Sequence, residues 1–234
     1  MRRGAMKQFS FILLSGGVGK RMQLNTPKQF LLLAGKPIFI HVLEKIDNIS
    51  EIKEIIIPCP TNFIHKTQQI ISDYRFTKPI FCVEGGESRQ ESVYKGLKKA
   101  SYENTIIHES VRPFVTPDTF KKLIHANNES AILGLDIPFT VLNGKSIVEG
   151  ILKREELINV QLPHKYNTKK ILYAHECARE DELHFTEDAG LYFHYFNSEI
   201  SILKGSEYNI KITKPIDRII AEAIHKETIL LGDY

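Results

Sequence analysis

A glycine-rich segment followed by two cations lies near the start of the chain. Residues 14–22 read LSGGVGKRM, so an apolar run leads into glycines and then into Lys20 and Arg21. Glycines allow successive backbone N–H groups to turn toward one point, which forms a cradle for an anion. The two cations add positive charge where phosphate groups would lie. The segment predicts a phosphate-binding loop, and the alternative is a turn whose cations are simply solvated.

This loop departs from two common phosphate-binding patterns. The P-loop pattern requires Ser or Thr after its Gly-Lys pair, but Arg21 follows Lys20, which disfavours kinase or hydrolase chemistry of that type. The dinucleotide-binding pattern GxGxxG lacks its third glycine here. A third cation, Lys28, follows in the sequence PKQF and extends the basic segment.

Strand and helix patterns alternate along most of the chain. Apolar and β-branched runs predict strands at 9–15, 54–59, 79–83, 105–108, 131–136 and 200–203. Stretches with helical periodicity predict helices at 37–46, 62–74, 88–100, 117–126, 168–179, 187–196 and 215–227. This alternation is typical of right-handed βαβ units, so we expect a doubly wound, mostly parallel α/β sheet.

The regular alternation stops over residues 138–166. An Asn-Gly pair at 143–144 separates short apolar pieces at 141–142 and 146–148, which is a turn signal for a β-hairpin. We therefore expect a single domain over residues 1–234 that carries an inserted β-arm at about 138–166.

The composition argues against several classes of protein. The formal net charge of +3, from 31 Lys and Arg against 28 Asp and Glu, is too small to indicate a nucleic-acid or membrane-surface partner. No apolar run approaches the roughly 18 residues of a membrane-spanning helix. The apolar part of the basic N-terminal segment is shorter than a signal-peptide core. Cys59, Cys82 and Cys177 form no CxxC pair, which indicates reduced thiols in a cytoplasmic protein.

Four segments together carry a resemblance to a known family. They are GGVGKRM with PKQF, GGESRQESV at 85–93, HESVRP at 108–113, and YNIKIT at 208–213 with Pro215 and Asp217 after it. In this order they resemble the cytidylyltransferases that act on 2-C-methylerythritol 4-phosphate and on ribitol 5-phosphate, from about Phe9 to His225. The resemblance implies a Rossmann-like nucleotidyltransferase that converts CTP and a polyol phosphate into a CDP-polyol and pyrophosphate.

The same resemblance implies roles for individual residues. It implies catalytic roles at the CTP α-phosphate for Arg21, Lys28 and Lys211. It implies that CTP is bound by Ser15, Gly16, Gly17, Val18, Gly19, Lys20, Gly86, Arg89, Ser92 and Glu109. It implies that the polyol phosphate is bound by Arg112, Thr140, Arg154 and Thr213. Mg²⁺ would bridge CTP oxygens, with Glu109 as a candidate ligand. In the family the arm reaches across a homodimer to the neighbour's polyol-phosphate site.

Several of these residues also have plain structural interpretations. Arg112 could form an ion pair at the end of a strand, where surface charges contribute little. Ser92 could lie on a helix surface, and Lys211 could extend from an apolar run to solvent. Arg154 lies in the charged run KREE, which could simply be solvated.

The sequence departs from the family pattern mainly on the polyol side. Glu109 stands where an aspartate is usual, and Phe139 replaces the aspartate of an Asp-Thr pair in the arm. The usual TPQ is Leu162-Pro163-His164, and a Thr-Asp pair near the later helix appears as Thr186-Glu187. The reaction type is therefore better supported than the identity of the acceptor.

Several functional alternatives follow from these departures. The segments SVRPF at 110–114 and YN at 208–209 are closer to the ribitol phosphate branch than to the isoprenoid branch, and the altered arm fits neither branch well. The acceptor could also be another sugar phosphate that feeds surface polysaccharide synthesis. A regulatory module that binds CTP but has lost its acceptor site is a hypothesis from a different class.

Overall fold

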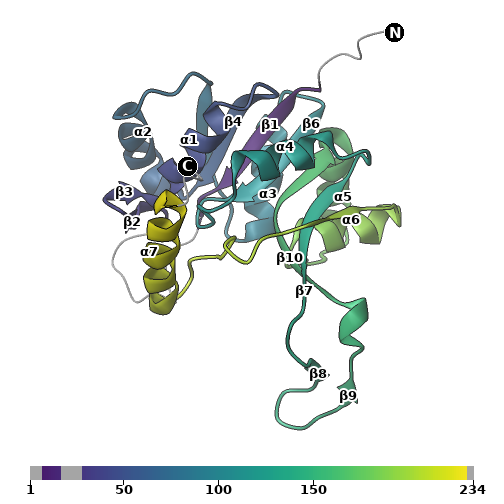
Figure 1. The fold of residues 1–234 in the computed structure, drawn as a ribbon. Coiled ribbons are helices and arrows are strands. Elements are labelled where there is room, and N and C mark those ends of the chain that lie inside the picture. Colours follow the sequence, from purple (N-terminus) through teal and green to yellow (C-terminus); the bar gives the residue numbers. More distant parts are fainter. Residues whose placement is uncertain (1–6, 17–27, 231–234) are drawn as a thin grey trace, which may run out of the picture.

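A seven-stranded sheet forms the centre of the computed structural model, which describes residues 7–16 and 28–230 (Figure 1). The order of its strands is β11-β7-β10-β6-β1-β4-β5. These strands are β1 (Phe9–Leu14), β4 (Ile52–Cys59), β5 (Ile80–Glu84), β6 (Asn104–Glu109), β7 (Ala131–Asp136), β10 (Ile158–Asn167) and β11 (Ser201–Lys204).

Most neighbouring strands in this sheet are parallel. β1 pairs in parallel with β4 and β6, β4 pairs in parallel with β5, and β11 pairs in parallel with β7. β10 runs antiparallel to both of its neighbours, β6 and β7. The chain moves from β1 outward to β4 and β5, and then returns to the other side of β1 at β6. This is the expected doubly wound, mostly parallel sheet.

Helices cover both faces of the sheet. One face carries α1 (Ile38–Asp47), α2 (Ile64–Ser72) and α4 (Pro117–His125). The other face carries α3 (Arg89–Lys99), α5 (Thr168–Glu180) and α6 (Asp188–Phe196). Short 3₁₀ turns lie at Lys28–Phe30, Thr61–Phe63 and Arg154–Glu156.

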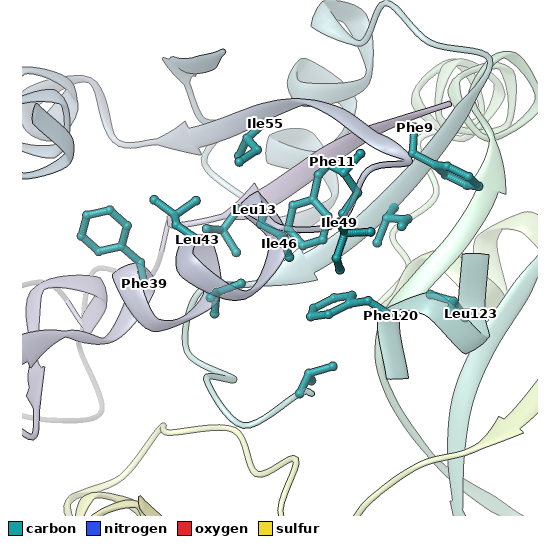
Figure 2. Packing of buried hydrophobic residues seen from close by; sticks show 14 of the residues in the cluster. Phe9, Phe11, Leu13, Phe39, Leu43, Ile46, Ile49, Ile55, Phe120 and Leu123 are labelled. Carbon is teal, nitrogen blue, oxygen red and sulfur yellow. The ribbon is translucent and has the colours of Figure 1, made fainter. Parts of the chain in front are cut away.

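Strand β1 shows why both faces must be covered. Its side chains alternate, so Phe9, Phe11 and Leu13 point into the cluster with α1 and α4. Ile12 and Leu14 point into the cluster with α3, α5 and α6. Figure 2 shows the first cluster, where the β1 side chains meet those of α1 and α4. A central parallel strand is buried on both sides, and this explains its continuous apolar sequence.

The last helix, α7 (Pro215–Leu230), packs beside a small hairpin that the sequence analysis did not predict. The hairpin consists of β2 (Leu32–Leu33) and β3 (Lys36–Pro37). Leu33 and Ile38 share a buried cluster with Ala221 and Ile224 of α7 and with Ile212. The C-terminal segment is thereby fixed against the region that follows the glycine-rich loop.

The arm is shorter than predicted and its hairpin has a different register. β8 (Leu142–Asn143) pairs with β9 (Gly150–Ile151), so residues 146–148 lie in the connecting loop and not in a strand. Residues 158–166, which the sequence analysis placed in the arm, form most of β10 in the central sheet. Figure 1 shows the β8–β9 hairpin extending away from the sheet, which two connecting segments of the chain join to it. Within the described residues, no helix is long and apolar enough to cross a membrane.

Gly96 provides a test of how closely α3 packs on the sheet. A Cβ atom at Gly96 would lie 2.9 Å from Cγ2 of Ile12 and 3.1 Å from Cγ of Pro58. We expect Gly96→Val to lower the free energy of unfolding by about 1–3 kcal/mol, because overpacked side chains must shift. Chemical denaturation measures the change. Gly150→Val is the matched control, because a Cβ there meets only Asn143 at 3.8 Å; equal effects of the two substitutions would contradict the packing argument.

Candidate active site

The carboxyl ends of three parallel strands meet at one edge of the sheet. β1 ends at Leu14 opposite Glu109, the last residue of β6. Ser15 donates its backbone N–H to Pro58 O of β4 at 3.0 Å, and Ser110 donates to Leu14 O at 3.0 Å. This edge is where the chain direction switches from one side of β1 to the other. Open α/β sheets bind their ligands in such a crevice.

Glu109 lies at this edge among three cations. Nζ of Lys211 donates to Oε1 of Glu109 at 2.9 Å, and Nε of Arg89 lies 3.4 Å from the same oxygen. Nε of Arg112 lies 3.5 Å from Oε2. The Glu109 side chain is 9% exposed, whereas that of Lys211 is 42% exposed. The four residues, called the Glu109 cluster below, form a partly open positive site around a buried carboxylate.

The electrostatics of this cluster favour the ionised carboxylate. Burial alone would raise the pKa of Glu109, but attraction to Lys211, Arg89 and Arg112 outweighs burial and holds that pKa below its ordinary value. Burial also lowers the pKa of the Arg112 guanidinium, which Glu109 partly offsets. The three cations outnumber the two carboxylates that contact them, Glu109 and Asp188, and this excess of positive charge suits an anionic ligand such as a phosphate group.

Lys211 is positioned by the segment of chain that precedes α7. This segment does not form a strand of the sheet. Ile212 donates its backbone N–H to Val111 O at 3.0 Å, and Arg112 Nη1 donates to Asn209 O at 2.8 Å. Asn209 in turn donates to Leu162 O at 2.7 Å. Arg112 therefore forms the strand-end ion pair that the sequence analysis named as an alternative to phosphate binding, and it also fixes the segment that carries Lys211.

Lys28 lies beside the same C-terminal segment. Its Nζ donates to the backbone oxygen of Thr213 at 2.9 Å, although the two residues are 185 positions apart. The Thr213 hydroxyl donates to Oδ2 of Asp217 at 2.8 Å, as part of the cap of α7. The Thr213 side chain thus has a structural role here, while Lys28 and Lys211 approach one edge of the sheet from different parts of the chain.

The start of α3 lies against the end of β1. A Cβ atom at Gly16 would lie 3.6 Å from Oγ of Ser92. That hydroxyl accepts from Gly86 N at 3.0 Å and donates to Ser88 O at 2.9 Å, so it fixes the loop before the helix. Gly86 must be glycine, because a Cβ there would lie 2.4 Å from Cβ of Glu91. Ser92 is therefore a loop-fixing residue at the site, and not a serine on the helix surface.

One buried pair in the site was not found from the sequence. Asp188, the first residue of α6, accepts from Nη2 of Arg89 at 2.6 Å. Its other oxygen, Oδ1, lies 3.3 Å from Nε2 of His175 in α5. An aspartate in the first turn of a helix is common, so no local pattern indicates that this one contacts an arginine 99 positions away.

Other predicted residues lie outside this cluster. Gly17, Val18, Gly19, Lys20 and Arg21 are outside the described residues. Thr140 and Arg154 are exposed in the arm, which Figure 1 shows extending away from the sheet. Arg154 Nη1 donates to Pro138 O at 3.4 Å, and Nη2 lies 3.7 Å from Glu155 Oε1.

The departures at 162–164 are buried. Leu162 is a core residue of the cluster that contains α5 and α6. His164 has no exposed surface; its Nδ1 lies 3.2 Å from the Tyr166 hydroxyl and 3.7 Å from Oε2 of Glu187. Burial lowers the pKa of His164 to about 4, so the ring is neutral at pH 7. Two of the sequence departures, His164 and Glu187, therefore face one another.

The fit of a divalent cation was tested on the same residues. No group of three or more His, Cys, Asp or Glu side chains is arranged to hold a metal in the described part of the chain. Oε2 of Glu109 accepts no hydrogen bond from a described residue, but it is buried and lies 3.5 Å from Nε of Arg112, so it would reach a cation only after the carboxylate turns. One carboxylate oxygen fits a Mg²⁺ ion that is held mainly by nucleotide oxygens and water.

Known proteins resemble this chain along nearly its whole length. A sequence profile of the 2-C-methyl-D-erythritol 4-phosphate cytidylyltransferase family matches residues 9–227. The enzyme of that name from Halalkalibacterium halodurans is 32% identical over 94% of this chain and 98% of its own. Its namesake from Clostridium botulinum is 36% identical with the same coverage. A crystal structure of 4-diphosphocytidyl-2C-methyl-D-erythritol synthase from Anaerococcus prevotii superposes with a TM-score of 0.82 at 27% identity, covering 94% of this chain and 99% of that one.

The lowered pKa of Glu109 predicts a pH-dependent contribution to stability. A carboxylate whose pKa falls on folding stabilises the protein fully above its unfolded-state pKa of about 4.3, and this contribution is lost as the pH falls through the folded-state pKa. We expect Glu109→Gln to lower the free energy of unfolding by about 3 kcal/mol at pH 7, because Lys211 and Arg112 lose the carboxylate they contact and Arg89 keeps only Asp188. The difference from wild type should narrow below about pH 4.3 in denaturant titrations.

The control for this measurement is Glu149→Gln, which changes an exposed glutamate of the arm. It should leave the stability unchanged at every pH. A Glu109→Gln effect that stays constant from pH 7 to the acid limit of folding would show that the carboxylate charge is not what matters.

Proposed function

We propose that this chain, which belongs to the 2-C-methyl-D-erythritol 4-phosphate cytidylyltransferase family, uses 2-C-methyl-D-erythritol 4-phosphate as its acceptor. Family membership makes it a CTP-dependent nucleotidyltransferase and confirms the resemblance found in the sequence. The relatives reported above carry the methylerythritol name, and this supports that acceptor over ribitol 5-phosphate. The observation that carries the proposed nucleotidyl transfer is the Glu109 cluster at the carboxyl edge of the sheet.

The proposed reaction forms one bond and breaks one. An oxygen of the acceptor phosphate attacks the α-phosphorus of CTP, and the bond from that phosphorus to the bridging oxygen of the β-phosphate breaks. Pyrophosphate leaves with the bonding electrons, and the product is a CDP-polyol. The protein forms no covalent bond in this scheme, so its contribution is to position two anions and to neutralise the charge at the α-phosphate.

The cations of the site suit these two tasks. Lys211 is the most exposed member of the Glu109 cluster, so its ammonium group can turn from Glu109 toward an α-phosphate oxygen. Lys28 approaches the same edge through Thr213, and we assign it to the triphosphate. The backbone N–H of Ser15 is donated to Pro58 O, so we assign the start of the backbone cradle for the phosphates to Gly16. The cradle would continue through residues 17–20, with Arg21 after it.

Glu109 would hold Mg²⁺ by one carboxylate oxygen once the nucleotide is bound. The bound ion would supply positive charge beside the triphosphate. Lys211, Arg89 and Arg112 would keep the Glu109 carboxylate ionised, which a metal ligand requires. At neutral pH the Glu109 carboxylate would therefore carry no proton on Oε2.

The arm supplies the rest of the acceptor site in this proposal. Thr140 and Arg154 are exposed in the arm, and the β8–β9 hairpin of the arm extends away from the central sheet (Figure 1). We therefore assign them to the acceptor phosphate of a second subunit in a homodimer, where an arginine fork suits a phosphate dianion. Exposed apolar side chains of the arm, such as Ile147 and Ile151, would be covered in that dimer. We place the enzyme in the cytoplasm because all three cysteines are free.

A panel of acceptors tests the proposed substrate. With CTP and Mg²⁺, pyrophosphate release should require 2-C-methyl-D-erythritol 4-phosphate, and ribitol 5-phosphate and glycerol 3-phosphate should give little release. Release with ribitol 5-phosphate or another sugar phosphate alone would reassign the acceptor. CTP binding without release for any acceptor would instead support a regulatory module that has lost its acceptor site.

Subunit mixing tests whether the arm acts in a neighbouring site. We expect Lys211→Ala to lower kcat by about 10²-fold, because the variant lacks a cation that stabilises the charge of the transition state. We expect Arg154→Ala mainly to raise the KM for the acceptor. When the two variants are refolded together, heterodimers regain one intact site, so the mixture should recover about one quarter of wild-type activity. No recovery, with heterodimers present, would place Arg154 outside the neighbour's site. Lys169→Ala, an exposed lysine on α5, is the control and should retain wild-type kinetics.

A further inference from the structure

Asp188 and Arg89 form a buried ion pair beside the Glu109 cluster. The Asp188 side chain is 1% exposed and its Oδ2 accepts from Nη2 of Arg89 at 2.6 Å. Nε2 of the fully buried His175 lies 3.3 Å from the other carboxylate oxygen. Attraction to Arg89 and contact with His175 hold the pKa of Asp188 well below its ordinary value against the effect of burial. The carboxylate is therefore ionised, and it is enclosed between α3, α5 and α6.

This pair fixes the orientation of the Arg89 guanidinium. Its Nη2 is directed to Asp188, while its Nε lies 3.4 Å from Oε1 of Glu109. A guanidinium group is planar and has five N–H donors in a fixed fork, so contacts on two sides define its plane. The attraction of Asp188 and Glu109 also raises the pKa of Arg89 above its ordinary value.

Without Asp188 the charges around Arg89 would be unbalanced. Glu109 already accepts from Lys211 and lies 3.5 Å from Arg112. A freed Arg89 would compete with these two cations for one carboxylate, and it would no longer be held at the start of α3. With both carboxylates present, Arg89 is held by Asp188 and Glu109. Lys211 is held by Glu109 and is partly exposed.

From these contacts we infer that Asp188 is a positioning residue for nucleotidyl transfer, which acts by holding Arg89 in the orientation that the nucleotide requires. The inference rests on the proposed function, since it assigns Arg89 to CTP. Asp188 itself is buried and acts through the arginine, so it need not touch either substrate. His175 contacts the carboxylate oxygen of Asp188 that Arg89 does not.

A double-mutant cycle on Arg89 and Asp188 tests this role. The variants are Asp188→Asn, Arg89→Lys and the double variant, each checked for folding by circular dichroism and thermal unfolding. We expect each single variant to lower kcat/KM for CTP by about 10- to 100-fold, because misplacement of a charged group lowers both binding and turnover. The double variant should be no worse than Arg89→Lys, since Asp188 has nothing left to position.

Asp118→Asn is the matched control, because Asp118 lies in the first turn of α4 as Asp188 does in α6, but it is exposed. It should stay within about twofold of wild type, as expected for loss of a helix-terminus charge alone. Wild-type kcat/KM for Asp188→Asn, or losses that multiply in the double variant, would overturn the inference.

Two further measurements keep the test decisive. If Asp188→Asn fails to fold, Asp188→Glu keeps the charge but displaces it by one methylene group, and a folded, fully active Asp188→Glu would overturn the role. If wild type releases no pyrophosphate, the proposed function fails separately, and the same cycle is then read from the Kd for CTP by titration calorimetry. Unchanged CTP affinity in Asp188→Asn would overturn the inference in that case too.

Discussion

Cations can be gathered at one point of a protein only if a counterion keeps them from repelling one another. In this molecule the counterion is Glu109, which lies within 3.5 Å of nitrogen atoms of Lys211, Arg89 and Arg112. These three cations come from three regions that are far apart in the sequence, namely the start of α3, the end of β6 and the segment before α7. Mutual repulsion would separate them if the carboxylate were absent. The position of Glu109 at the end of a central strand therefore determines where the positive site can form.

The fold places these groups together through the direction of its strands. β1, β4 and β6 are parallel, so their carboxyl ends and the loops that follow them lie at one edge. The C-terminal segment reaches the same edge because α7 is fixed by a cluster of apolar side chains that includes Ile212, next to Lys211. Apolar packing thus positions the backbone of the segments that carry the cations. The charged side chains extend only a short distance from these rigid elements. This separation of roles is common in α/β sheets, where the ligand site lies outside the strand ends.

The sequence predicted the elements well wherever one local signal dominated. β1 and β7 are continuous apolar runs, and α4 has proline in its first turn, so each was found within one residue of its observed bounds. β10 was missed because its sequence INVQLPHKYN mixes polar residues and a proline with apolar ones, and its burial comes from pairing with β6 and β7. The arm hairpin was predicted, but a two-residue turn was expected at Asn143-Gly144, and the strands instead pair across a six-residue loop.

For the site, the residues that carry charge could be named from the sequence, but their partners could not. Arg89, Glu109, Arg112 and Lys211 were all predicted as site residues, whereas nothing local indicated that they would share one carboxylate. Asp188 was missed entirely, because its importance lies in a contact with Arg89 across 99 positions. The sequence analysis placed Leu162 and His164 on the polyol side of the site, but both are buried. We therefore expect them to act through the packing of β10 and α6 and not by contact with the acceptor.

The two buried carboxylates explain how one site can be both stable and ready to bind an anion. Asp188 is buried and forms an ion pair with Arg89. If Arg89 turned to another partner, the carboxylate of Asp188 would remain buried without a cation, which is unfavourable. Glu109 is shared among several cations, one of which is 42% exposed, so Lys211 can leave it while Arg89 and Arg112 keep it neutralised. A triphosphate that enters this edge would therefore draw on Lys211 first. Arg89 would meet the nucleotide in the orientation it already has, and the free energy of binding need not be spent on reordering it.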